Sequence, residues 1–69
     1  MTRARDFDAL EMAVDAAVAV EDVSFRRSML VECLRQATVF AHDASIDDAG
    51  RVRCTRVGLR IQWLLGATR

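Results

Sequence analysis

The sequence predicts a small all-α protein, a bundle of two or three helices that is completed by homodimerisation. Turn residues are scarce: the 69 residues include no Pro and three Gly, and residues 1–49 contain neither. Such a chain has little means of forming β-hairpins. Ala, Leu and Arg are abundant and favour helices. Apolar residues also recur at helical spacing along most of the chain.

The length predicts one helical domain over residues 1–69. Domains below ~70–80 residues rarely bury enough apolar surface alone, which favours oligomerisation. Ten basic residues balance ten acidic ones, so the formal net charge is zero. Arg3 and Arg5 precede acids rather than an apolar run, and the longest apolar stretch, residues 16–20, is far below the ~20 residues that span a bilayer. We therefore expect a soluble, cytoplasmic protein without membrane contacts.

A first helix is expected over residues 4–21, with Thr2 as its N-cap. Its core stripe has the i, i+3, i+4 and i+7 spacing of one helix face and comprises Phe7, Leu10, Val14, Ala17 and Val18. A neighbouring stripe is acidic: Asp8, Glu11, Asp15 and Asp22. A third face is unusually apolar for a side that faces solvent, and comprises Ala9, Met12, Ala13, Ala16 and Val20.

A second helix is expected over residues 25–43, capped by Asp22 or Ser24. Its core stripe comprises Leu30, Cys33, Leu34, Ala37, Phe40 and Ala41. The apolar phase of the first helix does not continue into this stripe, which predicts a break near residues 21–24. Because no Gly or Pro enforces the break, one long bent helix over residues 4–43 is the alternative, and the fold would then be a helical hairpin.

Residues 44–50 are the clearest loop. Ser45 and Asp48 have the spacing of a capping box, which predicts Ser45 as the N-cap of a third helix. That helix is expected to end at Leu65, with Gly66 as the C′ residue.

The third helix is apolar on two sides. One stripe comprises Cys54, Val57, Gly58, Ile61 and Leu65, with Leu64 at its edge; the other comprises Val52, Leu59 and Trp63. Arg53, Arg56 and Arg60 lie between them. A helix with two apolar sides must bury both. Within one chain, the two other short helices cannot easily cover both sides of the third helix. The second apolar side therefore predicts a subunit interface or a bound partner.

Charge is unevenly distributed along the chain. Residues 1–22 contain two Arg and six acids, whereas residues 44–69 contain five Arg and two Asp. The acidic stripe of the first helix and the basic stripe of the third can pair within one chain or between two. Such exposed pairs contribute ~0–1 kcal/mol each and would set orientation more than stability.

No constellation of residues indicates catalysis or metal binding. Cys33 and Cys54 are 21 residues apart with no CxxC motif, and His42 is the single histidine. We expect two buried, reduced thiols and a surface histidine. So short a helical chain also offers little room for a substrate pocket. We therefore expect no enzyme, no cofactor, no metal and no small-molecule substrate.

The leading functional hypothesis is non-catalytic binding of another protein, because Trp and Arg among aliphatic residues are typical of interface hot spots. The expected partner-binding residues are Val52, Arg53, Arg56, Leu59, Arg60 and Trp63. In size and helical content the chain is similar to small phage- or plasmid-encoded regulators that cap a host protein, which implies a regulatory or inhibitory role. The alternative is a small DNA-binding regulator that uses the Arg-rich face of the third helix.

Overall fold

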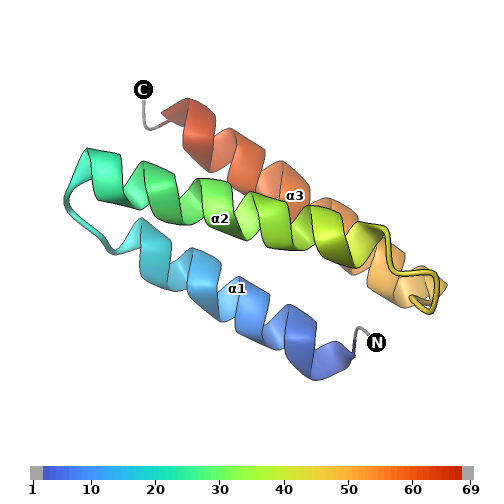
Figure 1. Ribbon diagram of the computed structural model, residues 1–69. Helices are drawn as coiled ribbons and strands as arrows, with labels where there is room; N and C mark the ends of the chain where they lie inside the picture. Colours follow the sequence, from blue (N-terminus) through green and yellow to red (C-terminus); the bar gives the residue numbers. More distant parts are fainter. Residues whose placement is uncertain (1–2, 68–69) are drawn as a thin grey trace.

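The computed structural model describes residues 3–67 as a bundle of three helices, in which each helix runs antiparallel to the one before it (Figure 1). The helices are α1 (Ala4–Val18), α2 (Val23–Ala41) and α3 (Asp48–Ala67). α2 packs against both other helices, and α1 also contacts α3. The described residues contain no strand. The expected all-α class and the small helical bundle are confirmed.

The expected break between the first two helices is also confirmed. α1 ends at Val18, and a short connection leads to α2, so the alternative of one long bent helix is wrong. The carboxylate of Asp22 caps α2 by accepting a hydrogen bond from the amide of Phe25, 2.8 Å away. Arg26 donates from Nη1 to the carbonyl of Val20 at 2.9 Å, which ties the connection to α2. The first helix is three residues shorter than expected, because it ends at Val18 rather than at residue 21.

The caps of α1 and α3 differ from the expected ones. Arg3 is the N-cap residue of α1, and its amide donates to the Asp6 carboxylate; the expected cap, Thr2, lies outside the described residues. α3 begins at Asp48, and Asp47 caps it by accepting from the amide of Gly50 at 2.7 Å.

The capping role predicted for Ser45 is therefore wrong. Its amide and hydroxyl both donate to the carboxylate of Asp43, which makes a tight turn before the helix. Ile46 follows and is buried in the core. α3 starts two residues after this buried side chain, at Asp48.

The end of α3 also differs from the expectation. Gly66 is helical, and α3 continues to Ala67, so Gly66 is not the C′ residue. No glycine in residues 3–67 has a positive φ. A helix-terminating role needs that left-handed conformation, and Gly66 does not adopt it.

The core forms where the predicted stripes of the three helices meet. It comprises Phe7, Leu10, Val14, Ala17, Leu30, Cys33, Ala37, Ile46, Cys54, Val57 and Ile61. Two residues of the predicted stripes, Val18 and Ala41, are exposed instead. Each is the last residue of its helix, where the chain turns away from the bundle. None of the described helices is both long and apolar enough to cross a membrane.

Candidate protein-binding face

The second apolar stripe of α3 lies in solvent. The exposed fraction is 71% for Trp63, 62% for Leu59 and 53% for Val52. At about 100° per residue these positions point away from Val57 and Ile61, which are buried against the other helices. We refer to Val52, Arg56, Leu59 and Trp63 as the outer face of α3. The structure thus excludes Trp63 from the core of its own chain.

Arg53, expected among the binding residues, instead joins α3 to α1. Its Nε donates to the carboxylate of Glu11 at 2.8 Å, and its Nη2 donates to Asp8. The guanidinium also lies over the ring of Phe7, 5.5 Å from the ring centroid. This side chain is therefore already engaged within the chain.

Arg60 is engaged in the same way. Its Nη2 donates to the carboxylate of Asp15 at 2.8 Å. Of the three arginines expected in the binding set, only Arg56 forms no ion pair within residues 3–67. The acidic stripe of the first helix and the basic stripe of the third thus pair within one chain.

The contact between α1 and α3 shifts the pKa values of Glu11 and Arg53. The hydrogen bond from Arg53 lowers the pKa of Glu11 below its ordinary value of 4.5. The hydrogen bonds to Glu11 and Asp8 raise the pKa of Arg53 in turn. Both groups are charged at neutral pH, so the contact fixes the position of α3 against α1.

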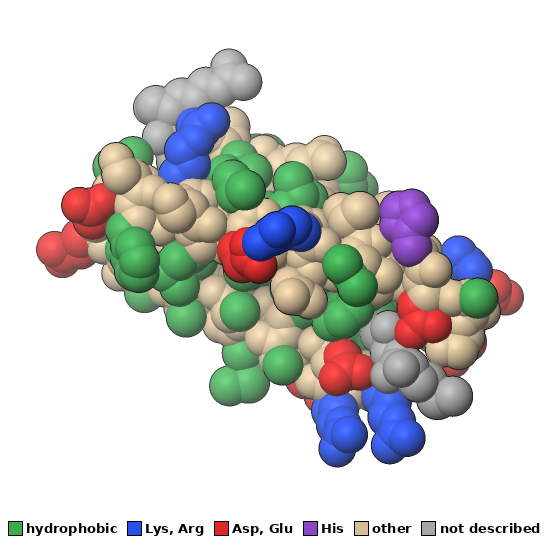
Figure 2. Space-filling model, viewed as in Figure 1, with side chains coloured by type: hydrophobic (Ala, Val, Ile, Leu, Met, Phe, Trp, Pro, Cys, Tyr) green, Lys and Arg blue, Asp and Glu red, His purple; other side chains and the backbone are tan. Residues whose placement is uncertain are grey.

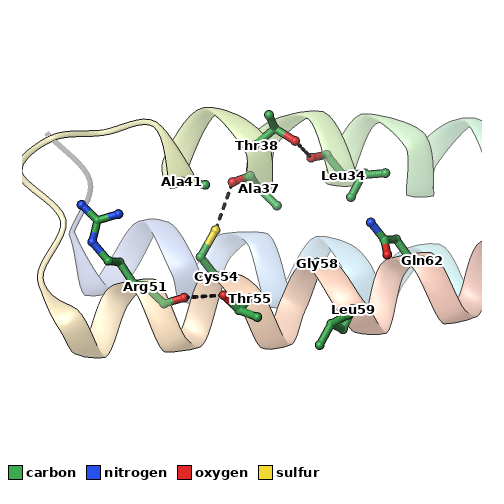
Figure 3. A pocket seen from close by; sticks show the side chains of 10 residues that line it. All are labelled: Leu34, Ala37, Thr38, Ala41, Arg51, Cys54, Thr55, Gly58, Leu59 and Gln62. Carbon is green, nitrogen blue, oxygen red and sulfur yellow. Dashed lines mark hydrogen bonds between the residues drawn. The ribbon is translucent and has the colours of Figure 1, made fainter.

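A groove between α2 and α3 borders the outer face of α3 (Figure 3). It has a volume of about 470 Å³, and Leu59 and Gly58 are among its lining residues. A Cβ atom placed on Gly58 would meet nothing within 4 Å. The groove therefore adds an open depression beside the outer face of α3, and Leu59 belongs to both.

The two cysteine thiols lie in the packed interior of the bundle. Cys33 and Cys54 are both free and buried, as expected. Cys54 Sγ donates to the carbonyl of Ala37 at 3.1 Å, as Figure 3 shows. Burial raises the pKa of both thiols, which disfavours the reactive thiolate.

His42 is exposed and lies at the C-cap of α2, where its Nδ1 is 2.8 Å from the carbonyl of Thr38. In the part of the chain that the structure describes, no three His, Cys, Asp or Glu side chains are grouped to hold a metal ion.

Comparisons with known proteins supply no relative: no family model, no curated protein and no solved structure matches this chain.

Proposed function

We propose that this chain is a non-catalytic protein-binding module, a small regulatory or inhibitory protein that binds another protein through the outer face of α3. The observation that carries the proposal is the 71% exposure of Trp63 beside Leu59 and Val52. A Trp side chain carries up to about 250 Å² of mostly apolar surface, which favours burial against a partner. Trp is also among the residues that most often dominate binding energy.

The surroundings of Trp63 suit a partner with apolar and acidic side chains. Arg56 is exposed on the same face and pairs with no carboxylate within residues 3–67. A partner carboxylate beside Arg56 would form a charge-assisted hydrogen bond at the rim of the interface. In this proposal the protein acts in the cytoplasm without cofactor or substrate.

A DNA-binding role fits the same helix less well. Arg53 and Arg60 bind carboxylates of α1, so phosphate groups would have to compete with Glu11 and Asp15 for them. Two arginines of this helix segment, Arg51 and Arg56, form no ion pair within residues 3–67. Two phosphate contacts would give only weak binding, because each neutralised phosphate adds little affinity.

Affinity capture with matched variants tests the proposal. The wild type, Trp63→Ala and Phe25→Ala are each immobilised and exposed to an extract of the native host, and the retained proteins are identified by mass spectrometry. Phe25 is the control because it is another aromatic residue, 58% exposed, on α2. The partner should bind the wild type and Phe25→Ala but lose about thirtyfold in affinity for Trp63→Ala.

The salt dependence of binding distinguishes protein binding from DNA binding. Binding through the outer face of α3 should persist when the salt concentration is raised severalfold, because apolar contacts dominate it. Equal binding to Trp63→Ala and the wild type would contradict the proposal. Retention of nucleic acid that is released steeply with salt would favour the DNA-binding alternative instead.

A further inference from the structure

We propose that a second copy of this chain binds to the outer face of α1 in antiparallel orientation, forming a twofold symmetric dimer. The outer face of α1 is here the exposed stripe of Ala9, Met12, Ala13 and Ala16. This surface is on a different helix from the outer face of α3. The dimer therefore goes beyond the proposed function and is tested separately from it.

The outer face of α1 is apolar and is bordered by a groove. Met12 is 70% exposed. Beside it, α1 and α2 enclose a groove of about 400 Å³, whose apolar lining residues are Ala9, Leu10, Ala13, Met29, Cys33 and Phe40. A partner helix that lies on this face covers the Met12 side chain and part of the groove lining.

The alanines set how closely a partner helix can approach. Ala9, Ala13 and Ala16 follow one another at spacings of four and three residues, so they lie on one side of α1. Helices pack 8–10 Å apart depending on the side chains between them, and alanine allows the shorter distance. The 15 residues of α1 give a contact about 22 Å long.

The charges at the two ends of α1 indicate that the molecule bound to its outer face is a second copy of this chain. Arg5 lies at the start of α1 and Glu21 just beyond its end; both are exposed, and neither forms an ion pair within residues 3–67. Consider two antiparallel α1 helices related by a twofold axis that passes near residues 12 and 13. Ala9 of one copy then lies opposite Ala16 of the other, and Arg5 lies opposite the region of Glu21. The twofold axis makes this contact twice. A parallel pair would bring like charges together instead.

The space-filling view agrees with this distribution of charge. Basic side chains project at the start of α1 with acidic surface beside them, acidic side chains lie at the α1–α2 connection, and apolar side chains lie between the two ends (Figure 2). Three acids in the middle of α1, namely Asp8, Glu11 and Asp15, bind arginines of α3. They therefore do not oppose the approach of a second α1.

The outer face of α3 lacks this self-complementarity. Arg56 is its one charged residue, and Arg51 is the next basic side chain along the neighbouring groove. Two copies of this face would place arginine near arginine with no carboxylate to receive it. The second copy is therefore assigned to α1, and the outer face of α3 is left for a different protein.

Sedimentation equilibrium tests the dimer. The wild type should approach twice the 7.7 kDa chain mass as its concentration rises. Met12→Glu should remain monomeric, because it places two carboxylates near the twofold axis, and circular dichroism should confirm that this exposed site tolerates the change. Trp63→Ala should associate like the wild type. A wild type that is monomeric up to about 1 mM, or a dimer that Trp63→Ala abolishes, would overturn the proposal.

A charge exchange tests the antiparallel register. Arg5→Glu and Glu21→Arg should each weaken self-association about tenfold, since each variant sets like charges against each other twice. Mixing the two variants should restore association, because every contact in the mixed dimer again joins Arg to Glu. If the mixture associates no better than the separate variants, the antiparallel pairing of α1 is wrong.

Discussion

Trp63 is the largest apolar side chain of the protein, and its own chain leaves it in solvent. We expect Trp63→Ala to change the free energy of unfolding by no more than about 0.5 kcal/mol, the usual range for surface substitutions. A buried residue of this size would cost ~3–5 kcal/mol. Circular dichroism during thermal unfolding measures the difference. Loss of the helical signal at 25 °C would make Trp63 a structural residue and displace the binding face.

The cysteines contribute through packing. Replacing Cys33 and Cys54 together by Ala should leave the chain helical, at a cost of up to a few kcal/mol for the lost apolar contacts. Adding a reductant to the wild type should change nothing, because both thiols are free. The measurement is urea unfolding of both proteins with and without reductant. A wild type that loses structure on reduction would instead contain a disulfide.

At the scale of the helices, the sequence predicts interiors better than ends. The apolar stripes locate the buried faces because burial repeats at the helical period. The ends depend on single hydrogen bonds: Asp47 rather than Ser45 caps α3, and both lie in the same acidic loop. Ile46 lies between them and is buried in the core, a tertiary contact that no local pattern contains.

Two glycines of α3 give opposite predictions. A Cβ on Gly58 meets nothing within 4 Å, so Gly58→Ala should stabilise the protein by about 0.5–1 kcal/mol through helix propensity. A Cβ on Gly50 would lie 2.6 Å from Cγ1 of Ile46, so Gly50→Ala should destabilise the protein. Urea unfolding of both variants tests the pair. Two variants with the same sign of change would contradict the packing of Ile46 against α3.

The contact between α1 and α3 predicts a pH dependence. Arg53 lowers the pKa of Glu11 in the folded protein, whereas the unfolded chain titrates near the ordinary 4.5. Below that value the unfolded chain binds more protons, so this contribution to stability is full above pH 4.5 and is lost as the pH falls through the lowered pKa.

Glu11→Gln should therefore show a shallower loss of stability on acidification than the wild type. Arg53→Met, which removes the other partner, should flatten the same part of the curve. Unfolding free energies measured between about pH 5 and pH 3 provide the comparison. Parallel curves for the wild type and both variants would show that the contact does not hold in solution.

For the whole molecule, the sequence indicates which surfaces need partners but not which partner each one takes. The acidic and basic stripes were equally able to pair within a chain or between chains, and only the packing of α3 against α1 assigns Arg53 and Arg60 to their own chain. The exposure of Trp63 depends on the same packing. The sequence still indicates which side faces the bundle, because the stripe with Cys54, Val57 and Ile61 is the longer of the two, and these residues are buried.

The two buried thiols lie at different helix contacts, so their rates of alkylation report which contact opens. Cys33 lines the groove between α1 and α2, and Cys54 lines the groove between α2 and α3. An alkylating reagent reaches a buried thiol only when the covering helix moves away, so the labelling rate measures that opening. α1 is the shortest of the three helices. We expect it to detach first in the monomer, so Cys33 should be labelled faster than Cys54 in the monomeric Met12→Glu variant when peptides are analysed by mass spectrometry. Equal rates would mean that the three helices separate in one cooperative step.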